Sequence, residues 1–288
     1  MISRIAEVAR DGLVLDVLDE GPLVADDPGD AVVLLHGFPE RATSWRDVAP
    51  LLHAAGMRTL AVDQRGYAPR ARPPRRRDYV ATELAADALA VVEAVRAQGV
   101  RRVHLAGHDW GAAVAWAAAV LAPHLVTSLT ALSVPHPGAF ARSWFTSRQG
   151  LASWYMLLFN VPGLAERLAR EPGGRFDRQL LAAGMTPAEV DRFRREIVDA
   201  GALPGGLAWY RAIALTPPAL LNRHVKVPTT MVWGRHDAAV TWAPVKRTRR
   251  YVDADYDLQV ILDAGHWIPT QAAGFVADRI IERVRSVT

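Results

Sequence analysis

Short, almost wholly apolar segments alternate with helical patterns along this chain, and this alternation limits the fold more than any other feature. The segments Ala31–His36, Arg58–Asp63, Arg102–Ala106 and Ser128–Val134 have the length and composition of buried strands. Strands without polar alternation are covered on both faces, which is typical of parallel strands joined by helices. The sequence therefore predicts an α/β fold with a mostly parallel central sheet and helices on both faces.

Two helices are expected between these strands. The segment Thr82–Ala97 repeats apolar residues at the three- and four-residue spacing of one helical face, with Thr82 as the expected N-cap. The segment Trp110–Leu121 is rich in alanine and ends just before Pro123. The first strands differ, because Arg4–Ala9 and Leu13–Asp19 flank an Asp-Gly pair, a hairpin signal. The sheet should therefore open with antiparallel strands.

Residues 139 to about 222 show only helical patterns. The clearest helix start combines Thr186 and Glu189 in a capping box, with Pro187 at the first helical position. Strand patterns return at Thr229–Trp233 and Leu258–Leu262, and a closing helix is expected over 271–285. The predicted organisation is an α/β core in two parts, 1–136 and 223–288, separated by a helical cap or lid over 137–222.

Composition excludes several classes of protein. Of the 288 residues, 50% are hydrophobic and 22% are charged, which is ordinary for a globular chain. There is no cysteine, so a disulfide scaffold, a cysteine-ligated zinc site and a cysteine nucleophile are excluded. The N-terminus lacks the apolar core of a secretory signal, and the longest apolar run is shorter than the about 20 residues of a spanning helix. We expect a cytoplasmic protein with no membrane partner.

A cluster of arginines between Arg70 and Arg77 contributes to the net charge of +4 and the isoelectric point of about 9.7. Such a run can bind nucleic acid. No aromatic residue interleaves with it, and nearly all basic residues of this chain are arginine. We therefore expect a solvated loop and no nucleic-acid partner.

The strongest candidate for chemistry is a G-x-D-x-G pattern, Gly107 to Gly111, between a predicted strand and a predicted helix. Two glycines permit a sharp strand-to-helix turn in which the backbones approach closely. The central residue, Asp109, is then exposed at the carboxyl end of the sheet, where open α/β sheets place their sites. The pattern predicts that Asp109 is a nucleophile; the alternative is a helix-capping aspartate.

Two further residues follow in the order acid, then histidine, that such a nucleophile requires. Asp237 follows one predicted strand and His266 follows the next, so both should lie at the same edge of the sheet as Asp109. The backbone N–H groups of Phe38, after an earlier strand, and of Trp110, after the nucleophile, could stabilise a developing oxyanion. A simple Gly-x-Pro turn would explain the Phe38 loop equally well.

Taken together, these motifs resemble the α/β-hydrolase superfamily, and within it the soluble epoxide hydrolases. The resemblance covers nearly the whole chain and is carried by five motifs: His36-Gly37-Phe38-Pro39-Glu40, Asp63-Gln64-Arg65-Gly66-Tyr67, Gly107–Gly111, Gly234–Asp237 and Gly265–Trp267. It implies an α/β-hydrolase fold with an inserted helical cap whose two tyrosines hold the epoxide oxygen. The matching residues are Tyr155 and Tyr210, although the family often has Asn where Ala208 stands.

The residue types explain this chemistry. Asp109 would attack an epoxide carbon and form an alkyl ester, and water activated by His266, oriented by Asp237, would release a vicinal diol. Neutral tyrosine can protonate the leaving alkoxide. No metal or organic cofactor is required. We expect the substrate to be a small apolar epoxide in a pocket lined by Phe38, Trp110, Trp154, Phe159, Trp209 and Trp267.

Two alternatives remain at this level. A haloalkane or haloacetate dehalogenase would use the same Asp–His–Asp set, but halide binding requires N–H donors, and Trp110 could supply one from its indole. Haloalkane dehalogenases carry Asn where Phe38 stands, and fluoroacetate-type dehalogenases carry Phe there but usually Arg where Trp110 stands. The second alternative is a catalytically silent hydrolase fold that binds a ligand, since fold alone does not establish activity. Association into a homo-oligomer is left open.

Overall fold

The computed structural model describes residues 3–23 and 29–287, so the outermost ends of both predicted core segments and residues 24–28 lie outside the described part. Its centre is one eight-stranded sheet with the order β1-β2-β4-β3-β5-β6-β7-β8. The strands are β1 (Glu7–Arg10), β2 (Leu13–Glu20), β3 (Asp30–Leu35), β4 (Arg58–Asp63), β5 (Arg102–His108), β6 (Ser128–Leu132), β7 (Thr229–Gly234) and β8 (Tyr256–Ile261).

The strand directions agree with the sequence patterns. From β4 to β8 along the sheet, neighbouring strands are parallel, whereas β1–β2 and β2–β4 are antiparallel. The turn between β1 and β2 places Asp11 at φ 51° and Gly12 at φ 79°, the left-handed conformation that a tight hairpin requires. The predicted parallel sheet with an antiparallel start is therefore confirmed.

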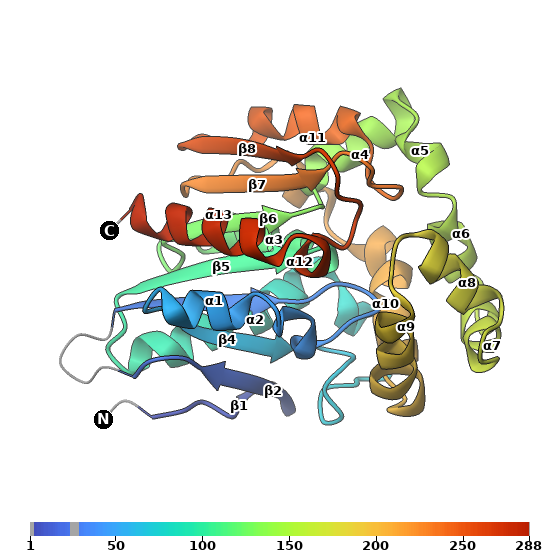
Figure 1. Cartoon of the computed structure of the whole chain (residues 1–288), viewed down its shortest axis with the longest axis horizontal. Coiled ribbons are helices and arrows are strands. Elements are labelled where there is room, and N and C mark those ends of the chain that lie inside the picture. The colour runs from blue at the N-terminus through green and yellow to red at the C-terminus, as the bar shows by residue number, and fades with distance from the viewer. Residues whose placement is uncertain (1–2, 24–28, 288) are drawn as a thin grey trace.

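Helices cover both faces of the sheet (Figure 1). On one face, α1 (Ala49–Ala54) and α13 (Ala273–Arg285) pack together, and on the other α2 (Ala81–Ala97) lies against α3 (Trp110–Leu121). The remaining helices of the core are α11 (Trp242–Thr248), α12 (Ile268–Gln271) and the 3₁₀ turns η1 (Ala42–Trp45), η2 (Arg76–Tyr79) and η6 (Arg249–Tyr251). The predicted cap at Thr82 is wrong: the N-cap of α2 is Val80, and no side chain caps it.

A helical insertion, residues 137–222, follows β6 and precedes β7. In Figure 1 most of it lies beyond the carboxyl ends of the parallel strands. Its helices are α4 (Pro137–Thr146), α5 (Gln149–Ala152), α6 (Tyr155–Phe159), α7 (Leu164–Arg170), α8 (Arg175–Ala182), α9 (Pro187–Phe193), the π-helical turn η3 (Arg194–Asp199), α10 (Leu203–Ala212), η4 (Ile213–Leu215) and η5 (Pro218–Asn222). The predicted capping box is present, with Thr186 and Glu189 each bonding the other's backbone N–H.

The arginine cluster contributes to the junction between core and insertion. Arg72 donates hydrogen bonds to the carbonyl oxygens of Ala200, at 2.9 Å, and Gly201, at 3.1 Å. Arg70 forms ion pairs with Glu7 and Asp16 of the first hairpin. These contacts give part of the cluster a structural role. In the part of the chain that the structure describes, no helix is long and apolar enough to cross a membrane.

Candidate active site

Asp109 lies in a strained turn between β5 and α3. Its backbone has φ 52° and ψ −119°, a conformation that costs a non-glycine residue free energy and that clusters at functional sites. The flanking glycines are required by close backbone contacts. A Cβ atom at Gly107 would lie 2.3 Å from the carbonyl oxygen of Gly111, and one at Gly111 would lie 2.0 Å from that of Leu35. The sequence pattern thus produces the sharp turn that places Asp109 at the carboxyl end of the sheet, facing the cavity.

Two groups contact the carboxylate of Asp109, which is buried. The backbone N–H of Phe38 donates to its Oδ1 at 2.8 Å, and His266 Nε2 lies 3.3 Å from its Oδ2. Burial favours the neutral acid, but the hydrogen bond and positive charge of His266 outweigh this and hold the pKa of Asp109 below its usual range. Asp109 is therefore ionised at neutral pH, as a nucleophile must be.

His266 lies between two carboxylates. Its Nδ1 is 2.8 Å from Asp237 Oδ2, on the side of the ring away from Asp109. The other Asp237 oxygen accepts backbone N–H bonds from Ala239, at 2.8 Å, and Val240, at 2.9 Å, which fix the carboxylate. Burial lowers the pKa of His266, but the two aspartates, Asp237 foremost, outweigh burial and raise that pKa well above its usual value. The resting histidine is therefore protonated at neutral pH.

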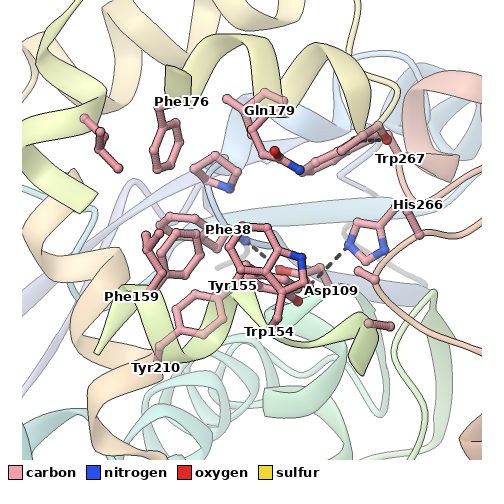
Figure 2. A pocket seen from close by; sticks show the side chains of 18 of the residues that line it. Phe38, Asp109, Trp154, Tyr155, Phe159, Phe176, Gln179, Tyr210, His266 and Trp267 are labelled. Carbon is pink, nitrogen blue, oxygen red and sulfur yellow. Dashed lines mark hydrogen bonds and ion pairs between the residues drawn. The ribbon is translucent and has the colours of Figure 1, made fainter. Parts of the chain in front are cut away.

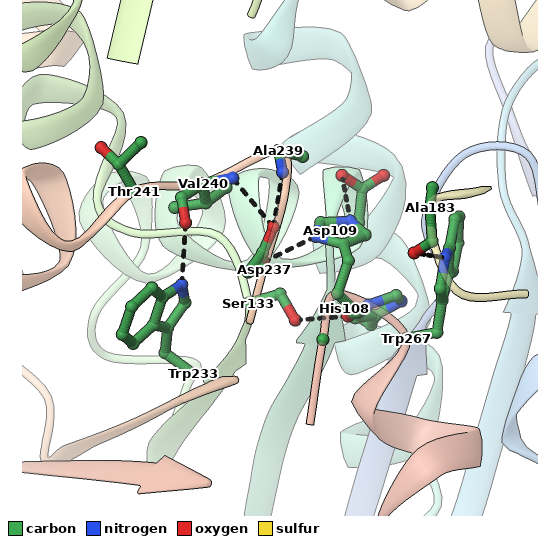
Figure 3. A network of polar contacts seen from close by, with 12 residues as sticks. His108, Asp109, Ser133, Ala183, Trp233, Asp237, Ala239, Val240, Thr241 and Trp267 are labelled. Atoms are coloured by element: carbon green, nitrogen blue, oxygen red, sulfur yellow. Dashed lines mark hydrogen bonds and ion pairs between the residues drawn. The ribbon is translucent and has the colours of Figure 1, made fainter. Parts of the chain in front are cut away.

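The loop that carries His266 is held by residues that the sequence did not single out (Figure 3). The His266 carbonyl accepts hydrogen bonds from the Ser133 hydroxyl, at 2.7 Å, and from His108 Nε2, at 2.9 Å. The Nδ1 of His108 lies 3.5 Å from a carboxylate oxygen of Glu40. His108 ends β5 and Ser133 directly follows β6, so the pairing of these two strands brings both side chains to the His266 loop.

Tyr155 and Tyr210 come from the helical insertion, on α6 and α10, and both line the cavity that contains Asp109 and His266. Figure 2 shows the two rings facing the Asp109 side of this cavity. Burial and the charge of Asp109 raise the pKa of both hydroxyls above the ordinary tyrosine value. Trp110, whose ring packs edge-on against Tyr210, partly opposes that rise in the pKa of Tyr210. Both tyrosines are therefore neutral donors near the nucleophile.

The cavity has a volume of about 240 Å³ and a mostly apolar wall. Four of the six predicted pocket residues line it: Phe38, Trp154, Phe159 and Trp267. Trp110 and Trp209 do not, which corrects the prediction. The indole N–H of Trp209 donates to the Arg65 carbonyl at 2.8 Å, and its ring packs edge-on against Trp110, so both tryptophans lie behind Tyr210.

The sequence missed more than half of the lining. The additional residues are Pro39, Ala152, Leu158, Leu168, Arg175, Phe176, Gln179, Leu180, Ala183, Ala238 and Ala239. No local signal marks them, because a residue of a short amphipathic helix can face the cavity, the core or a neighbouring helix. Within residues 3–23 and 29–287, no group of three or more histidine, aspartate or glutamate side chains is arranged to hold a metal ion.

The two backbone N–H groups predicted to stabilise an oxyanion, those of Phe38 and Trp110, differ in their contacts with Asp109. The Phe38 N–H already contacts the carboxylate, whereas the Trp110 N–H lies at the first residue of α3, directly after Asp109. Close packing explains how Phe38 reaches this position: a Cβ atom at Gly37 would lie 2.5 Å from the Cβ of Asp109. The arrangement offers one backbone donor in place, and the contribution of Trp110 stays a prediction.

Comparison with known proteins gives a consistent result. Residues 30–273 match the family model of the alpha/beta hydrolase fold. Epoxide hydrolase A of Mycobacterium tuberculosis is 32% identical over 96% of this chain and 95% of its own length. An AB hydrolase superfamily protein of Bacillus subtilis is 30% identical over 97% of each chain.

Solved structures agree. Epoxide hydrolase A from Mycobacterium thermoresistibile superimposes with a TM-score of 0.82 at 27% identity, over 98% of each chain. An epoxide hydrolase of Bacillus megaterium, solved with an inhibitor, shares the fold with a TM-score of 0.83 at 23% identity, over 97% of this chain and 99% of that one. With the sharp strand-to-helix turn at Asp109, the sheet order and the helical insertion, these likenesses show that the chain belongs to the α/β-hydrolase family, in the branch of the epoxide hydrolases.

Proposed function

We propose that this protein is an epoxide hydrolase that opens an epoxide through an ester on Asp109 and releases a vicinal diol. One observation carries the proposal beyond the family: Tyr155 and Tyr210 line the same cavity as Asp109 and His266. A carboxylate nucleophile opposite neutral hydroxyl donors fits a substrate whose leaving group is an alkoxide oxygen. Relatives named as epoxide hydrolases over nearly the full length support the same activity.

In the first step, an Asp109 oxygen attacks one epoxide carbon and forms a C–O ester bond. The bond between that carbon and the epoxide oxygen breaks, and its electron pair goes to the oxygen. Tyr155 and Tyr210 donate hydrogen bonds to this oxygen, and one of them supplies the proton. Raised pKa values keep both tyrosines protonated until negative charge develops in front of them.

In the second step, His266 Nε2 takes a proton from water, and the resulting hydroxide attacks the ester carbonyl of Asp109. The Phe38 N–H, and in our proposal the Trp110 N–H, stabilise the oxyanion of this tetrahedral intermediate. Asp237 holds the imidazole and stabilises its positive charge. Collapse of the intermediate breaks the ester C–O bond, and the proton of the added hydroxyl passes to the leaving alkoxide oxygen, which releases the diol and restores the Asp109 carboxylate.

The charges around His266 explain how it becomes a base. In the resting protein its pKa is raised by both aspartates. Ester formation removes the Asp109 charge, so one of the two stabilising partners is lost and the pKa of His266 falls. Its proton can then neutralise the tyrosinate that the first step leaves, and the neutral imidazole is ready to accept a proton from water.

The position of Trp110 disfavours dehalogenation. A halide leaving group needs N–H donors directed into the cavity, but the Trp110 ring packs edge-on against Tyr210 and does not line the cavity. The same geometry argues against a silent binding fold, because the nucleophile, base and orienting acid contact one another in sequence.

The proposal also covers the role of the helical insertion, the class of substrate and the cellular compartment. We propose that the helical insertion acts as a cap that excludes water from the first step. Small apolar epoxides and water are the proposed substrates, and no nucleic-acid partner is proposed. The proposed compartment is the cytoplasm. The mostly apolar lining of the cavity supports the choice of substrate.

Single turnover in water enriched in oxygen-18 tests the mechanism. With protein in excess over styrene oxide, the first diol should carry ordinary oxygen, because its new oxygen comes from Asp109, and the label should appear in the peptide that contains Asp109. Label in the diol on the first turnover would instead show direct attack by water and would refute the ester. Asp109→Asn should abolish turnover, and a matched control, Asp263→Asn, should not.

A further inference from the structure

The cavity contains two polar side chains that the proposed chemistry does not use. Four of the proposed catalytic residues line the cavity, namely Asp109, Tyr155, Tyr210 and His266. The other charged and amide side chains of the lining are Arg175 and Gln179. The lining indole of Trp267 is already engaged, because its N–H donates to the Ala183 carbonyl at 3.0 Å. Together with the indole of Trp154, these two side chains are the remaining hydrogen-bond donors of an otherwise apolar wall, and such donors call for a polar group on the ligand.

Both residues belong to α8 and are four positions apart, so they lie on one face of the helix. Figure 2 shows the Gln179 amide pointing into the cavity from the side opposite Asp109. Arg175 lies one turn earlier on the same face, and both side chains are exposed, so the pair lies at the solvent edge of the lining. Both donors are therefore available to the outer end of a ligand whose other end lies at Asp109.

Neighbouring acids are paired with other arginines. Asp177 forms its ion pair with Arg194 at 2.6 Å, and Glu166 forms its pair with Arg211 at 2.8 Å. Among the described residues, Arg175 forms no ion pair and no side-chain hydrogen bond, so its charge is available to a ligand.

Apolar side chains line the cavity alongside these two donors: Leu158, Phe159, Leu168, Phe176 and Leu180. A ligand that fits must therefore present an epoxide to Asp109, an apolar body to these side chains, and an acceptor group to α8. We propose that Arg175 and Gln179 form a subsite for a carboxylate at the outer end of an apolar epoxide substrate. This inference rests on the proposed epoxide hydrolase function and specifies its substrate class.

The test compares two substrates that differ only at one end, an aliphatic epoxide with a terminal carboxylate and its methyl ester. The wild-type protein should hydrolyse the acid with about tenfold higher kcat/KM than the ester, through a lower KM, because a hydrogen bond to an ionised acceptor is stronger than one to a neutral acceptor. The preference should shrink as salt is raised, since Arg175 is exposed.

The variant Arg175→Met should lose the preference for the acid through a higher KM for the acid, whereas its KM for the ester should change much less. Gln179→Met should raise KM for the acid several-fold. Arg178→Met is the matched control, because Arg178 lies on the same helix, donates to the Gly173 carbonyl and does not line the cavity. It should retain the full preference for the acid.

The outcomes separate this inference from the function on which it rests. Equal kcat/KM for acid and ester in the wild type, with no effect of Arg175→Met, would overturn the subsite while leaving the hydrolase activity intact. Failure to hydrolyse the acid, the ester and styrene oxide would refute the proposed function and the subsite together. A thermal unfolding midpoint of Arg175→Met equal to that of the wild type shows that a lost preference for the acid does not come from misfolding.

Discussion

Gly205 of α10 packs directly against Gly66 of the loop that follows β4. A Cβ atom at Gly205 would lie 2.2 Å from the Gly66 carbonyl oxygen, and one at Gly66 would lie 2.8 Å from the Gly205 carbonyl carbon. The next residue, Gly206, leaves equally little room beside Tyr67 and Phe38. This backbone contact sets how deeply α10 approaches the core, and one turn later the same helix carries Tyr210 into the cavity.

The variant Gly205→Ala tests this contact. The added methyl group must push α10 away from the core, so we expect a loss of about 1–3 kcal/mol in unfolding free energy. The rate of ester formation should also fall, because Tyr210 moves with the helix. Urea unfolding and stopped-flow measurement of the first step report the two effects. Gly274→Ala is the control: α13 has open space there, and alanine should be neutral or slightly stabilising.

Removal of the base should trap the intermediate. His266→Gln leaves Asp109 and the two tyrosines in place, so the first step should run while hydrolysis of the ester stops. We expect the intact mass of the variant protein to rise by the mass of one epoxide molecule, and we expect peptide mapping to place the adduct on Asp109. A rise equal to a haloalkane minus hydrogen halide, from a mixed panel, would contradict the epoxide function.

The tyrosines should act on the first step only. Tyr155→Phe and Tyr210→Phe each remove a donor to the developing alkoxide, and loss of one such donor typically costs about 10²–10³ in rate. Ester formation should slow in both, with a larger effect in the double variant, while hydrolysis of any ester that forms keeps its rate. An unchanged rate of ester formation in the double variant would remove the tyrosines from the mechanism.

Asp237 should control the pKa of His266. Asp237→Asn keeps an oxygen for the N–H groups of Ala239 and Val240, but removes the charge that most raises that pKa. Ester hydrolysis should fall by up to about 10⁴, by analogy with the serine-protease triad template. The pKa of His266, followed by NMR, should move down. If the pKa of His266 stayed high in Asp237→Asn, Asp109 alone would be the cause of the raised pKa.

Stability should depend on pH through the same histidine. Its folded-state pKa lies above the unfolded value of about 6.5. The stabilisation from the His266 charge is therefore fully present below pH of about 6.5, and is lost as pH rises through the folded-state pKa. The difference in unfolding free energy between wild type and His266→Gln should shrink from pH 6 to pH 9. A difference that grew with pH would contradict the raised pKa.

The core was readable from sequence because its signals are local. Apolar runs such as Arg58–Asp63 occur where a strand is buried on both faces, and the ranges of β4 and α3 match their predictions. The glycines around Asp109 are equally local, since a sharp turn needs them wherever the chain goes next. The spacing of strands then indicated that Asp109, Asp237 and His266 would meet at one sheet edge.

Tertiary structure alone decided what surrounds that edge. Trp110 and Trp209 are the same residue type as the tryptophans that line the cavity, yet they pack behind Tyr210. The Gly66–Gly205 contact and the Trp209 hydrogen bond to Arg65 decide this, because they set the position of α10. The face that α8 presents, with Arg175 and Gln179, depends on how short helices pack on one another. Local sequence determines which residues can form a strand, a turn or a helix, whereas the lining of a cavity between two layers depends on the packing of both.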